Sequence, residues 1–341
     1  MNDRIQAWGD QPTQFFYQLT PDKILDAIES SLELRCTGRS FAHNSMENRV
    51  YELEIEMTTT ETSAYDRFRI VKFYRPGRWS RDQILEEHRF LGRLREDDIP
   101  VVAPLVLKDG ETLHTLKDLG LHYCVFPKVG GRAPHELTDE QLAEVGRLLA
   151  RMHNVGATME PASRVKIDAT SYGSQHLEFL LSHSFIPSEL ADRFKKVVGD
   201  LCDYAEPLFS RAEAIQLHGD CHLGNLLWRD RPFWVDFDDS VIGPPVQDLW
   251  LMILGRDEIH RDQMNKLLRA YELMREFDWD TLDLIEPLRA LRMIHFISWT
   301  AKRYEDPAFQ NAFPDFGQSK YWHEQIRDLE SQWEVCQSFR W

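Results

Sequence analysis

Hydrophobic and polar positions follow different periods in successive parts of the chain. A Thr-Pro pair, which is a helix-start signal, opens residues 20–32, and apolar residues then recur there at helical spacing. From residue 39 to residue 74 the period changes to that of strands, because residues 50–56 alternate and residues 68–74 form a β-rich run before a Pro-Gly turn. The pattern predicts a helix of about three turns followed by the strands of a sheet.

A second helix is predicted after these strands, over residues 81–96. Ile84, Leu91 and Leu94 share one face of it. Glu87 falls on the same face, three residues after Ile84 and four before Leu91. A carboxylate on a buried face needs a cation, so this helix predicts a charged partner on a neighbouring element.

The sheet is expected to continue after this helix. Residues 99–104 are predicted to begin another strand, and residues 123–131 to run from a strand into a loop that contains a Gly pair. Such a loop is typical of a hinge between domains. We therefore place the boundary at about residue 130, with a first domain over 1–130 and a second over 131–341.

The second domain has helical periodicity over most of its length. Residues 139–153 form an amphipathic pattern behind a capping box, residues 185–210 form another behind a Pro-Ser start, and the chain after residue 246 is helical with aromatic residues on apolar faces. Short apolar runs at 214–217 and 233–235 are the exceptions. The combination predicts an α+β fold with an antiparallel sheet lobe followed by a mainly helical lobe.

Composition narrows the class of protein. The chain has 341 residues, 43% of them hydrophobic, which suits two lobes or one large α+β domain. Its net charge of −16 argues against a general binder of nucleic acids or anionic membranes, since either would repel it. Five cysteines without a C-x-x-C pair, and no leader or membrane-length apolar stretch, lead us to expect a soluble cytoplasmic protein.

Candidate chemistry gathers in residues 217–225 and 233–238. The first segment carries H-x-D-x-x-x-x-N, the spacing of a kinase catalytic loop, in which Asp220 would accept the proton of an attacking hydroxyl and Asn225 would hold magnesium. Asp236, on the strand that follows, would supply a second hard oxygen ligand for Mg²⁺. The two segments together predict a phosphoryl-transfer site.

Two alternative hypotheses for these residues stay open. Asp and Asn in a turn between apolar runs form Asx-turns without any catalytic role. A metal-hydrolase cluster, with zinc as the ion, would instead use carboxylates and imidazoles of the same stretch, namely His218, Asp220, His222, Asp236 and Asp238. The hydrolase hypothesis ranks second because it leaves a strand lysine and a helix glutamate unexplained.

That lysine is Lys72, which lies inside an apolar strand pattern. A lysine in a strand is usually a solvated charge, but this one has the position of the kinase lysine that binds phosphate oxygens. Glu87 on the predicted helix is its natural partner, because a buried carboxylate is stable only beside a cation. Glu86 is the alternative, one residue step around the helix.

Two further segments are candidates for nucleotide binding. Residues 44–49 form a polar loop where a nucleotide kinase carries its phosphate-covering turn, but they contain no G-x-G-x-x-G, so Ser45 and nearby backbone N–H groups would have to approach the phosphates without glycine. An ordinary hairpin turn explains this loop equally well. At the hinge, backbone groups from Phe126 to Val129 are expected to hydrogen-bond adenine.

The interval that follows the second candidate metal ligand is short. Only eleven residues separate Asp236 from Asp248, too few for the long activation segment on which ordinary protein kinases dock peptides. Ser240 is the only hydroxyl in it, and neighbouring carboxylates would repel a phosphate there. Asp248, in the first turn of a helix, is expected to bond the catalytic-loop backbone or to complement the helix dipole. The short interval therefore favours a small molecule over a peptide as the acceptor of the phosphoryl group.

With these residues in view, the chain resembles the aminoglycoside phosphotransferase and choline kinase group of protein-kinase-like enzymes. Within that group it is similar to the bacterial stress response kinase A family, also called YihE or RdoA, over most of its length. The motifs that carry this similarity are Asn44-Ser45-x-Glu47-Asn48-Arg49-Val50-Tyr51, Val71-Lys72-Phe73-Tyr74-Arg75-Pro76, Gln83-Ile84-Leu85-Glu86-Glu87-His88, His218-Gly219-Asp220-Cys221-His222 and Pro245-Val246-Gln247-Asp248-Leu249-Trp250.

The resemblance implies a Ser/Thr protein kinase that uses Mg·ATP, autophosphorylates and acts in stress and cell-death responses in the cytoplasm. Carried over position by position, Asp220 would be the proton acceptor, Asn225 and Asp236 the magnesium ligands, and Ser45 a residue at the ATP phosphates. The sequence departs from the family by an extended stretch over 57–66, which is expected to lengthen a hairpin away from the chemistry.

These observations together predict a two-lobed, protein-kinase-like phosphotransferase that moves the γ-phosphoryl group of ATP to a hydroxyl. The resemblance favours a protein acceptor, whereas the short interval favours a small amino alcohol, sugar or aminoglycoside-like acceptor. A catalytically silent pseudokinase that serves as a binding module is the alternative from another class. The intact set of Lys72, Asp220, Asn225 and Asp236 counts against it.

Overall fold

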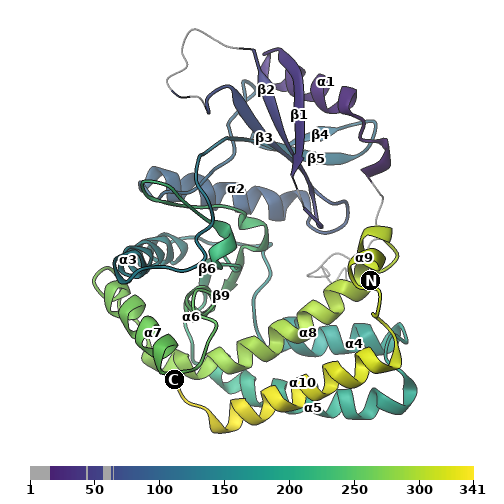
Figure 1. Cartoon of the computed structure of the whole chain (residues 1–341), viewed down its shortest axis with the longest axis vertical. Helices are drawn as coiled ribbons and strands as arrows, with labels where there is room; N and C mark the ends of the chain where they lie inside the picture. The colour runs from purple at the N-terminus through teal and green to yellow at the C-terminus, as the bar shows by residue number, and fades with distance from the viewer. Residues whose placement is uncertain (1–15, 44, 57–62, 64) are drawn as a thin grey trace. The chain divides into compact units, whose positions relative to one another are not determined.

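The chain divides into two compact units, each of which is described by itself. The computed structural model (Figure 1) describes residues 16–43, 45–56, 63 and 65–341. The first unit comprises Met1–Pro134 and Gly224–Asp238, and the second comprises His135–Leu223 and Asp239–Trp341. The break after Pro134 lies near the expected boundary at residue 130, but the expected division did not include the return of 224–238 to the first unit.

The first unit is built on an antiparallel five-stranded sheet in the order β1-β2-β3-β5-β4 (Figure 1). Its strands are β1 (Cys36–His43), β2 (Arg49–Ile55), β3 (Phe68–Phe73), β4 (His114–Leu116) and β5 (Leu121–Pro127). The alternating and β-rich patterns correctly predicted β2 and β3. In the observed register, Lys72 of β3 lies between Val50 of β2 and Cys124 of β5.

Helix α1 (Pro21–Leu32) packs its apolar stripe onto this sheet, after a single turn at Phe16–Gln18. The hydroxyl of Thr20 caps it by accepting a hydrogen bond from the backbone N–H of Lys23 at 3.4 Å. Ile28 is fully buried and belongs to the same cluster as Val71 and Phe73 of β3. Burying a side chain of this size contributes about 1.5–3 kcal/mol to the free energy of folding, so α1 and β3 stabilise each other.

Helix α2 (Arg81–Glu96) begins with a complete capping box formed by Ser80 and Gln83. Its buried face contains the predicted apolar residues, and Glu87 on that face is only 1% exposed. Glu86 is also buried, and an oxygen of its carboxylate lies 3.6 Å from a guanidinium nitrogen of Arg89, one turn further along the helix. The two carboxylates therefore differ in their surroundings, although both are buried.

One predicted strand is wrong. Residues 99–104 do not form a strand, and only Val101 makes an isolated bridge, to Trp234. Pro100 and Pro104 lack the N–H that a sheet ladder requires, which explains why this apolar run stays irregular. The short β4 occupies the sheet edge instead. The predicted extension over 57–66 falls mostly outside the described residues, which omit 57–62 and 64.

A β-hairpin from the second half of the sequence completes the first unit. It consists of a turn at Leu223–Asn225, β7 (Leu226–Trp228), β8 (Pro232–Trp234) and a turn at Phe237–Asp239. Val101 bridges Trp234, and Arg132 bridges Trp228, so the hairpin is bonded to the chain on both sides of the expected hinge. Trp234 is fully buried, which anchors the hairpin in the unit.

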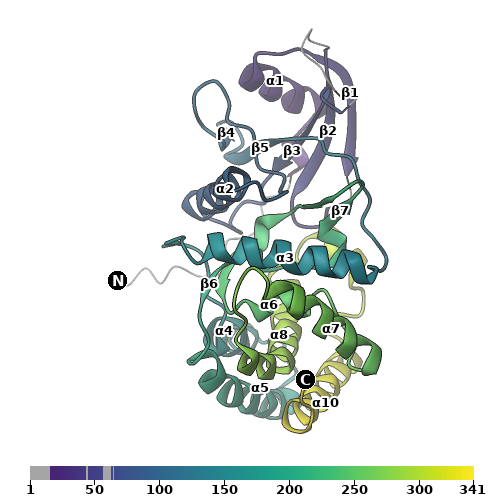
Figure 2. The same ribbon diagram turned by 90° about the vertical axis from the view of Figure 1, so that its left-hand side faces the viewer.

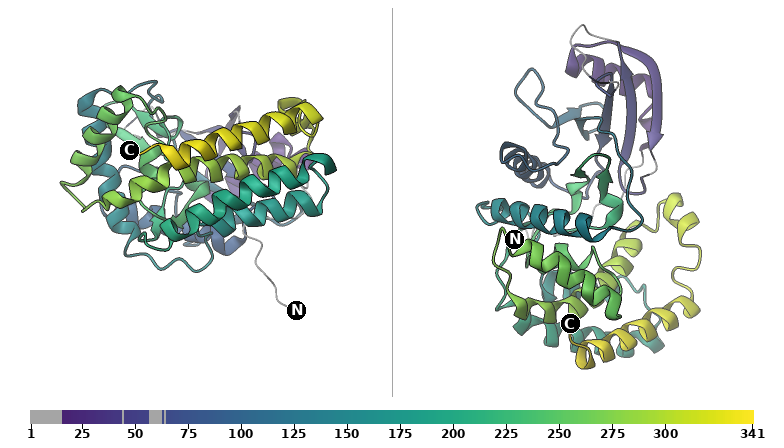
Figure 3. Two further views of the ribbon diagram at one scale, coloured as in Figure 1. Left: turned by 90° about the horizontal axis from the view of Figure 1, so that it is seen from below. Right: turned by 60° about the vertical axis from the view of Figure 1, so that its left-hand side comes forward.

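The second unit is mainly helical. Its described elements are α3 (Asp139–Gly156), a π-helical turn at Thr170–Ser174, α4 (Gln175–Ser182), α5 (Ser188–Phe209), β6 (Ile215–Leu217), β9 (Val241–Gly243), α6 (Val246–Trp250), α7 (Glu258–Tyr271), a turn at Trp279–Leu284, α8 (Ile285–Arg303), α9 (Pro307–Ala312) and α10 (Ser319–Ser338). Seen from below, α10, α8, α5 and α4 lie side by side (Figure 3, left).

Two close approaches bring the elements of the second unit to the candidate loop. Helix α3 lies against α7 (Figure 2), and a Cβ at Gly146 would clash with the carbonyl oxygen of Leu267. A Cβ at Gly156 would likewise clash with the carbonyl oxygen of Gln216 in β6. Glycine at both positions therefore lets α3 approach α7 and β6. Among the described residues, no helix is long and apolar enough to cross a bilayer.

Candidate active site

A pocket of about 530 Å³ in the first unit brings together six of the residues predicted from sequence, namely Ser45, Lys72, Glu87, Phe126, Val129 and Asp236. Val50, Ile70, Leu91, Val102 and Leu227 give it apolar walls. A pocket of this size, with apolar walls and a few charged groups, has the character of a small-molecule site. Asn225 belongs to the same unit, whereas Asp220 belongs to the second unit.

Lys72 provides the cation of this pocket. Its side chain is buried, and its Nζ lies 2.9 Å from Oδ1 of Asp236 and 2.6 Å from Oδ1 of Asp238. Burial opposes the charged form, but the carboxylates of Asp236, Asp238 and Glu87 raise the pKa of Lys72 well above its usual value. The ammonium therefore stays charged at neutral pH.

Asp236 presents its carboxylate to the pocket from a strained backbone. Its φ of 61° lies in the left-handed region, which a non-glycine residue adopts at a cost of about 1–3 kcal/mol. Its side chain is 55% exposed. The ring of Phe237, which follows, packs edge-on against Phe90 of α2 and holds the segment in place. Such strain at an exposed carboxylate is typical of a functional position.

Asn225 and Asp236 are carried by the two ends of the β7–β8 hairpin. The backbone N–H of Val235 donates to the carbonyl oxygen of Asn225 at 3.0 Å, so the residue before Asp236 is tied directly to Asn225. Asn225 is half-buried and Asp236 is exposed. One amide oxygen and one carboxylate oxygen donor on adjacent backbones form the hard-ligand set that Mg²⁺ prefers.

The zinc-hydrolase hypothesis finds no support in this geometry. Among the residues that the structure describes, no group of three or more His, Cys, Asp or Glu side chains is arranged to hold a metal ion. His218 is fully buried, and its Nδ1 accepts a hydrogen bond from the backbone N–H of Asp220 at 3.3 Å. The carboxylate of Asp238 is bound by Lys72 and Arg78.

The turn before β2 is held by side chains rather than opened by glycine. Ser45 Oγ accepts a hydrogen bond from the backbone N–H of Asn48 at 3.2 Å. The guanidinium of the buried Arg75 donates to the carbonyl oxygens of Glu47 at 2.9 Å and Met46 at 3.2 Å. These bonds fix the turn at the edge of the pocket. Asn44, which was predicted to belong to this turn, lies outside the described residues.

The hinge forms part of the wall of the pocket. Strand β5 ends at Pro127, and Phe126 and Val129 both line the pocket. Close packing continues past the hinge, because a Cβ at Gly131 would lie only 3.1 Å from Cβ of Leu227 in β7. Residues 126–129 therefore border the pocket beside the ion pair of Lys128 and Glu52, whose Nζ and Oε1 lie 2.6 Å apart.

In the second unit, Asp220 lies between a guanidinium group and an imidazole ring. Nη2 of Arg292, on α8, is 2.8 Å from Oδ1 of Asp220, and Nε2 of His222 is 3.3 Å from Oδ2. Burial alone would raise the pKa of Asp220, but His222 and Arg292 hold that pKa well below its usual range. Asp220 is therefore a carboxylate, not an acid, at any physiological pH. No sequence pattern pointed to Arg292, which lies 72 residues away.

Asp248 supports the loop that carries Asp220, as its place in the first turn of a helix led us to expect. Its Oδ2 accepts from the backbone N–H of His218 at 3.0 Å and its Oδ1 from that of Gly219 at 2.8 Å. Nε2 of His153 on α3 lies 3.2 Å from Oδ2, and Nδ1 of the same ring lies 2.8 Å from the hydroxyl of Tyr271. A buried network thus joins α3, α6 and α7 to the loop.

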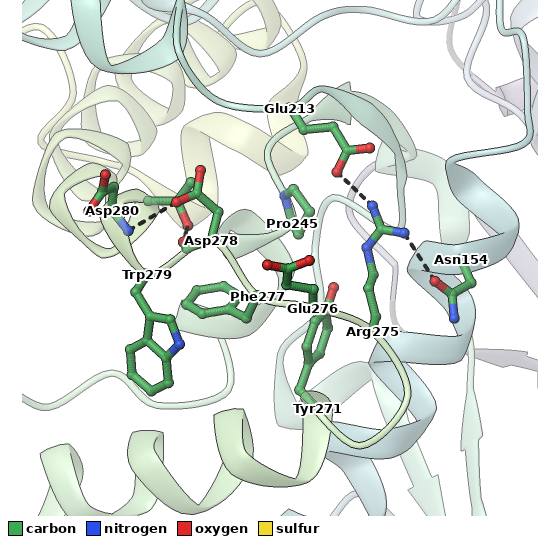
Figure 4. Close-up of a pocket in the computed structure, with 11 residues that line it drawn as sticks. Asn154, Glu213, Pro245, Tyr271, Arg275, Glu276, Phe277, Asp278, Trp279 and Asp280 are labelled. Carbon is green, nitrogen blue, oxygen red and sulfur yellow. Dashed lines mark hydrogen bonds and ion pairs between the residues drawn. The ribbon is translucent and has the colours of Figure 1, made fainter.

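A second cavity, of about 630 Å³, lies at the outer end of this network within the second unit (Figure 4). Tyr271 lines it, beside Phe277 and the half-exposed Trp279. Arg275 spans its rim, with guanidinium nitrogens 2.6 Å from Oε2 of Glu213 and 3.0 Å from Oδ1 of Asn154 (Figure 4). Tyr271 therefore lines a solvent-accessible cavity and also belongs to the hydrogen-bond network that holds the Asp220 loop.

The interval between Asp236 and Asp248 is folded rather than extended as a loop. Strand β9 within it pairs with β6, so that Val241 lies opposite Leu217. Ser240 is fully buried, and its hydroxyl donates to the carbonyl oxygen of Leu217 at 2.8 Å. The only hydroxyl of the interval therefore has a structural partner and no access to solvent.

The chain is similar to known phosphotransferases and kinases. A model of the phosphotransferase enzyme family matches residues 41–285. The chain is 39% identical over 324 residues to stress response kinase A of Escherichia coli (strain K12), a match that covers 94% of this chain and 95% of that protein. It is 38% identical over 322 residues to the serine/threonine protein kinase RdoA of Salmonella typhimurium (strain LT2), with 94% of both covered.

Solved structures confirm the expected fold. An amicoumacin kinase in complex with AMP-PNP, Ca²⁺ and Ami superposes with a TM-score of 0.70 at 18% identity, over 93% of this chain and 94% of that one. A microcompartment-associated aminopropanol kinase gives 0.64 at 18% identity, over 93% and 96%. The fold is that of the two-lobed phosphotransferases, with an N-terminal antiparallel sheet and a helical C-terminal part.

The support of the Asp220 loop generates a prediction about stability. His153→Ala should lower the free energy of unfolding by about 2–4 kcal/mol, because it removes a hydrogen-bond partner from buried Asp248 and Tyr271 and opens a cavity. Urea unfolding followed by tryptophan fluorescence measures the change. His323→Ala, at an exposed position of α10, is the matched control and should match the wild type. If His153→Ala has the same free energy of unfolding as the wild type, the network does not stabilise the fold.

Proposed function

The chain belongs to the phosphotransferase enzyme family and, within it, to the stress response kinase A family, and on this basis we propose that it is an ATP-dependent serine/threonine protein kinase. It transfers the γ-phosphoryl group of Mg·ATP to a protein hydroxyl, autophosphorylates and acts in cytoplasmic stress responses. The observation that carries the proposal is the buried ammonium of Lys72 beside the exposed carboxylate of Asp236 in one pocket.

The first-unit pocket suits a nucleotide. Its apolar walls fit a purine ring, and the backbone from Phe126 to Val129 supplies the polar edge that adenine needs. Lys72 and Ser45 lie in the same pocket, where the triphosphate would follow. Because Lys72 is held charged, it offsets phosphate charge without any proton movement. The AMP-PNP in the amicoumacin kinase complex supports nucleotide binding by this fold.

Magnesium is the metal that the donor set favours. Asn225 and Asp236 would hold it, because both offer oxygen atoms and neither is a soft ligand. When bound, the ion neutralises charge on phosphate oxygens. The protein's own contribution is to present Asp236 in a fixed orientation, through the backbone bond between Val235 and Asn225 and the packing of Phe237.

Asp220 is the candidate proton acceptor for the attacking hydroxyl. With Arg292 and His222 on its two oxygens, it remains ionised and weakly basic. It therefore orients the hydroxyl first and takes the proton only as the bond to phosphorus forms, which suits the loose transition state of phosphoryl transfer. The network through Asp248 keeps the loop rigid during this step.

The charge around Asp220 favours a protein acceptor over a cationic small molecule. Arg292 is 43% exposed beside Asp220, so its guanidinium borders the carboxylate that the acceptor hydroxyl would approach. An amino alcohol or aminoglycoside would be repelled there, whereas a hydroxyl in an acidic peptide would be attracted. One turn further along α8, the exposed Phe296 stacks on Trp299 and offers an apolar contact.

One observation favours the second candidate, a small hydroxylated acceptor. The interval between Asp236 and Asp248 is short and paired into the β6–β9 sheet, so it offers no activation segment on which a peptide docks. A protein acceptor must therefore be recognised by other surfaces, of which the exposed side of α8 at Arg292 and Phe296 is the candidate. The complete set of Lys72, Asp220, Asn225 and Asp236 counts against a silent pseudokinase.

The experiment that tests the proposed function compares acceptors directly. Purified enzyme is incubated with γ-labelled ATP, Mg²⁺ and either a bacterial lysate or a panel of amino alcohols and aminoglycosides. We expect label on protein Ser and Thr with the wild type and none with Asp220→Asn. Transfer of the label only to small molecules would show that the acceptor is a small hydroxylated molecule and not a protein. Absence of transfer to any acceptor, including water, would overturn the kinase assignment.

A prediction concerns the metal ligand. Asp236→Ala should reduce Mg²⁺-dependent turnover by at least about a hundredfold while the fold is retained, because the side chain is largely exposed and Lys72 keeps Asp238. Initial rates of ADP formation at several Mg²⁺ concentrations measure it. Asp230→Ala, whose side chain is 85% exposed in the β7–β8 turn, is the matched control. Strong activity restored by zinc instead would favour the hydrolase hypothesis.

Another prediction concerns acceptor charge. Arg292→Gln should raise the KM for a serine peptide with acidic flanks about tenfold and leave the KM for ATP unchanged, because Arg292 is partly exposed beside Asp220, the proposed proton acceptor. The assay uses two peptides that differ only in acidic or basic flanks. Lys320→Gln, an exposed charge removal on α10, is the control. If both peptides respond equally, Arg292 does not select the acceptor.

A third prediction is that activity needs no activating phosphorylation. Ser240 is fully buried and bonded to Leu217, so a kinase cannot reach it in the folded protein. Phosphatase-treated enzyme, checked by intact mass, should form ADP at the same initial rate as untreated enzyme, without a lag. Ser240→Ala should lose about 1–2 kcal/mol of stability but keep its activity to within about twofold. A lag removed by preincubation with ATP would reveal a phosphorylation switch.

A further inference from the structure

Asp238 lies at the centre of a buried group of polar contacts in the first unit. The residue is only 3% exposed. Its Oδ1 lies 2.6 Å from Nζ of Lys72, and its Oδ2 lies 3.2 Å from Nη1 of Arg78. The side-chain amide of Asn48 donates a hydrogen bond to Oδ2 as well. One carboxylate therefore receives an ammonium, a guanidinium and an amide from three separate segments.

These contacts belong to a balanced set of charges. Glu47 faces both arginines, with Oε1 3.6 Å from Nε of Arg75 and 3.7 Å from Nε of Arg78. Asp236 and Asp238 share Lys72. The two aspartates differ in exposure, because the side chain of Asp236 is 55% exposed and that of Asp238 is 4% exposed. The carboxylate of Asp236 is therefore able to turn toward a ligand in the pocket, whereas the carboxylate of Asp238 keeps its position.

The same carboxylate is attached to the turn that borders the pocket. Asn48 donates to Asp238 with its amide nitrogen, and its amide oxygen accepts from the backbone N–H of Arg75 at 3.0 Å. Its own backbone N–H donates to Ser45 Oγ. Asn48 thus links the position of Ser45 to Asp238 and to the end of β3. This linkage explains how a turn without glycine keeps one conformation beside the phosphate site.

We propose that Asp238 is a positioning residue for nucleotide binding, which fixes Lys72 and the Ser45 turn relative to each other while Asp236 is released to the metal ion. The inference rests on the proposed function, because it assigns Asp238 a role toward Mg·ATP. When Asp236 turns away, Lys72 keeps one buried counter-charge, so its ammonium is not left unpaired. The turn stays in place because Asn48 is bonded to the carboxylate that does not move.

The test measures binding of Mg·AMP-PNP by calorimetry, which requires neither turnover nor an acceptor. Asn48→Ala removes the amide that donates to Asp238, and Asp238→Asn removes the buried negative charge that Lys72 and Arg78 contact, so each should weaken binding about tenfold or more. Because the proposal has Asn48 act on the site through Asp238, adding Asn48→Ala to Asp238→Asn should weaken binding no more than about twofold further. Asp82→Asn, an exposed charge removal at the start of α2, should bind as the wild type does.

A magnesium titration separates a positioning role from metal ligation. The Mg²⁺ concentration at half-maximal nucleotide binding should rise in Asp236→Asn and stay at the wild-type value in Asp238→Asn. Equal shifts in both variants would make Asp238 a metal ligand and overturn the proposal. Multiplicative effects of Asn48→Ala and Asp238→Asn would overturn it too, because the two residues would then act separately.

Three further outcomes are decisive. Wild-type affinity in Asn48→Ala, with an unchanged melting temperature, would show that the turn does not depend on Asp238, and this variant decides the matter if Asp238→Asn fails to fold. Absence of nucleotide binding by the wild-type protein would overturn the proposed function and this inference together. Binding by the wild type with unaffected variants would overturn this inference alone.

Discussion

The candidate site of the first unit is organised around one buried ammonium group shared by two carboxylates. Lys72 is buried in the central strand of the sheet, and its charge is stable there because oxygens of Asp236 and Asp238 lie 2.9 Å and 2.6 Å from its nitrogen. The rest of the unit arranges this contact. The sheet register places Lys72, α2 carries Glu87 toward it, and the β7–β8 hairpin returns from the second half of the sequence to deliver both aspartates.

In the second unit, a buried carboxylate holds the loop that carries Asp220. Asp248 accepts two backbone N–H groups of the loop before Asp220, and His153 and Tyr271 complete its surroundings. A loop fixed in this way presents Asp220 without relying on flexible packing. Arg292 and His222 then keep Asp220 ionised. In both units, the candidate site carboxylate is thus held by groups that are themselves buried or bonded.

Local patterns in the sequence predicted the elements and the residues that belong to them. Lys72 follows from its place in an apolar strand and Glu87 from helical periodicity. Asp220 and Asn225 follow from the spacing of a short motif, and Asp236 from its place on the next strand. The structure places Lys72, Glu87 and Asp236 around one pocket. The predicted strand at 99–104 failed because two prolines outweigh an apolar pattern there.

The supporting residues were not predictable in this way. Asn48 and Arg78 contact Asp238 across 190 and 160 residues, and no spacing rule connects positions so far apart. Arg292 resembles any other arginine on an amphipathic helix until the fold brings it to Asp220. Gly224–Asp238 joins the first unit through tertiary contacts that composition does not reveal. Periodicity identifies elements and motifs, whereas long-range packing decides which charges meet.

The most direct measurement is a crystal structure of the protein with Mg²⁺ and AMP-PNP. We expect the carboxylate of Asp236 to coordinate the metal ion while Nζ of Lys72 remains at ion-pair distance from Asp238 and contacts the phosphates. A structure in which Asp238 coordinates the metal, or in which Lys72 leaves Asp238 for another carboxylate, would refute the shared-ammonium arrangement.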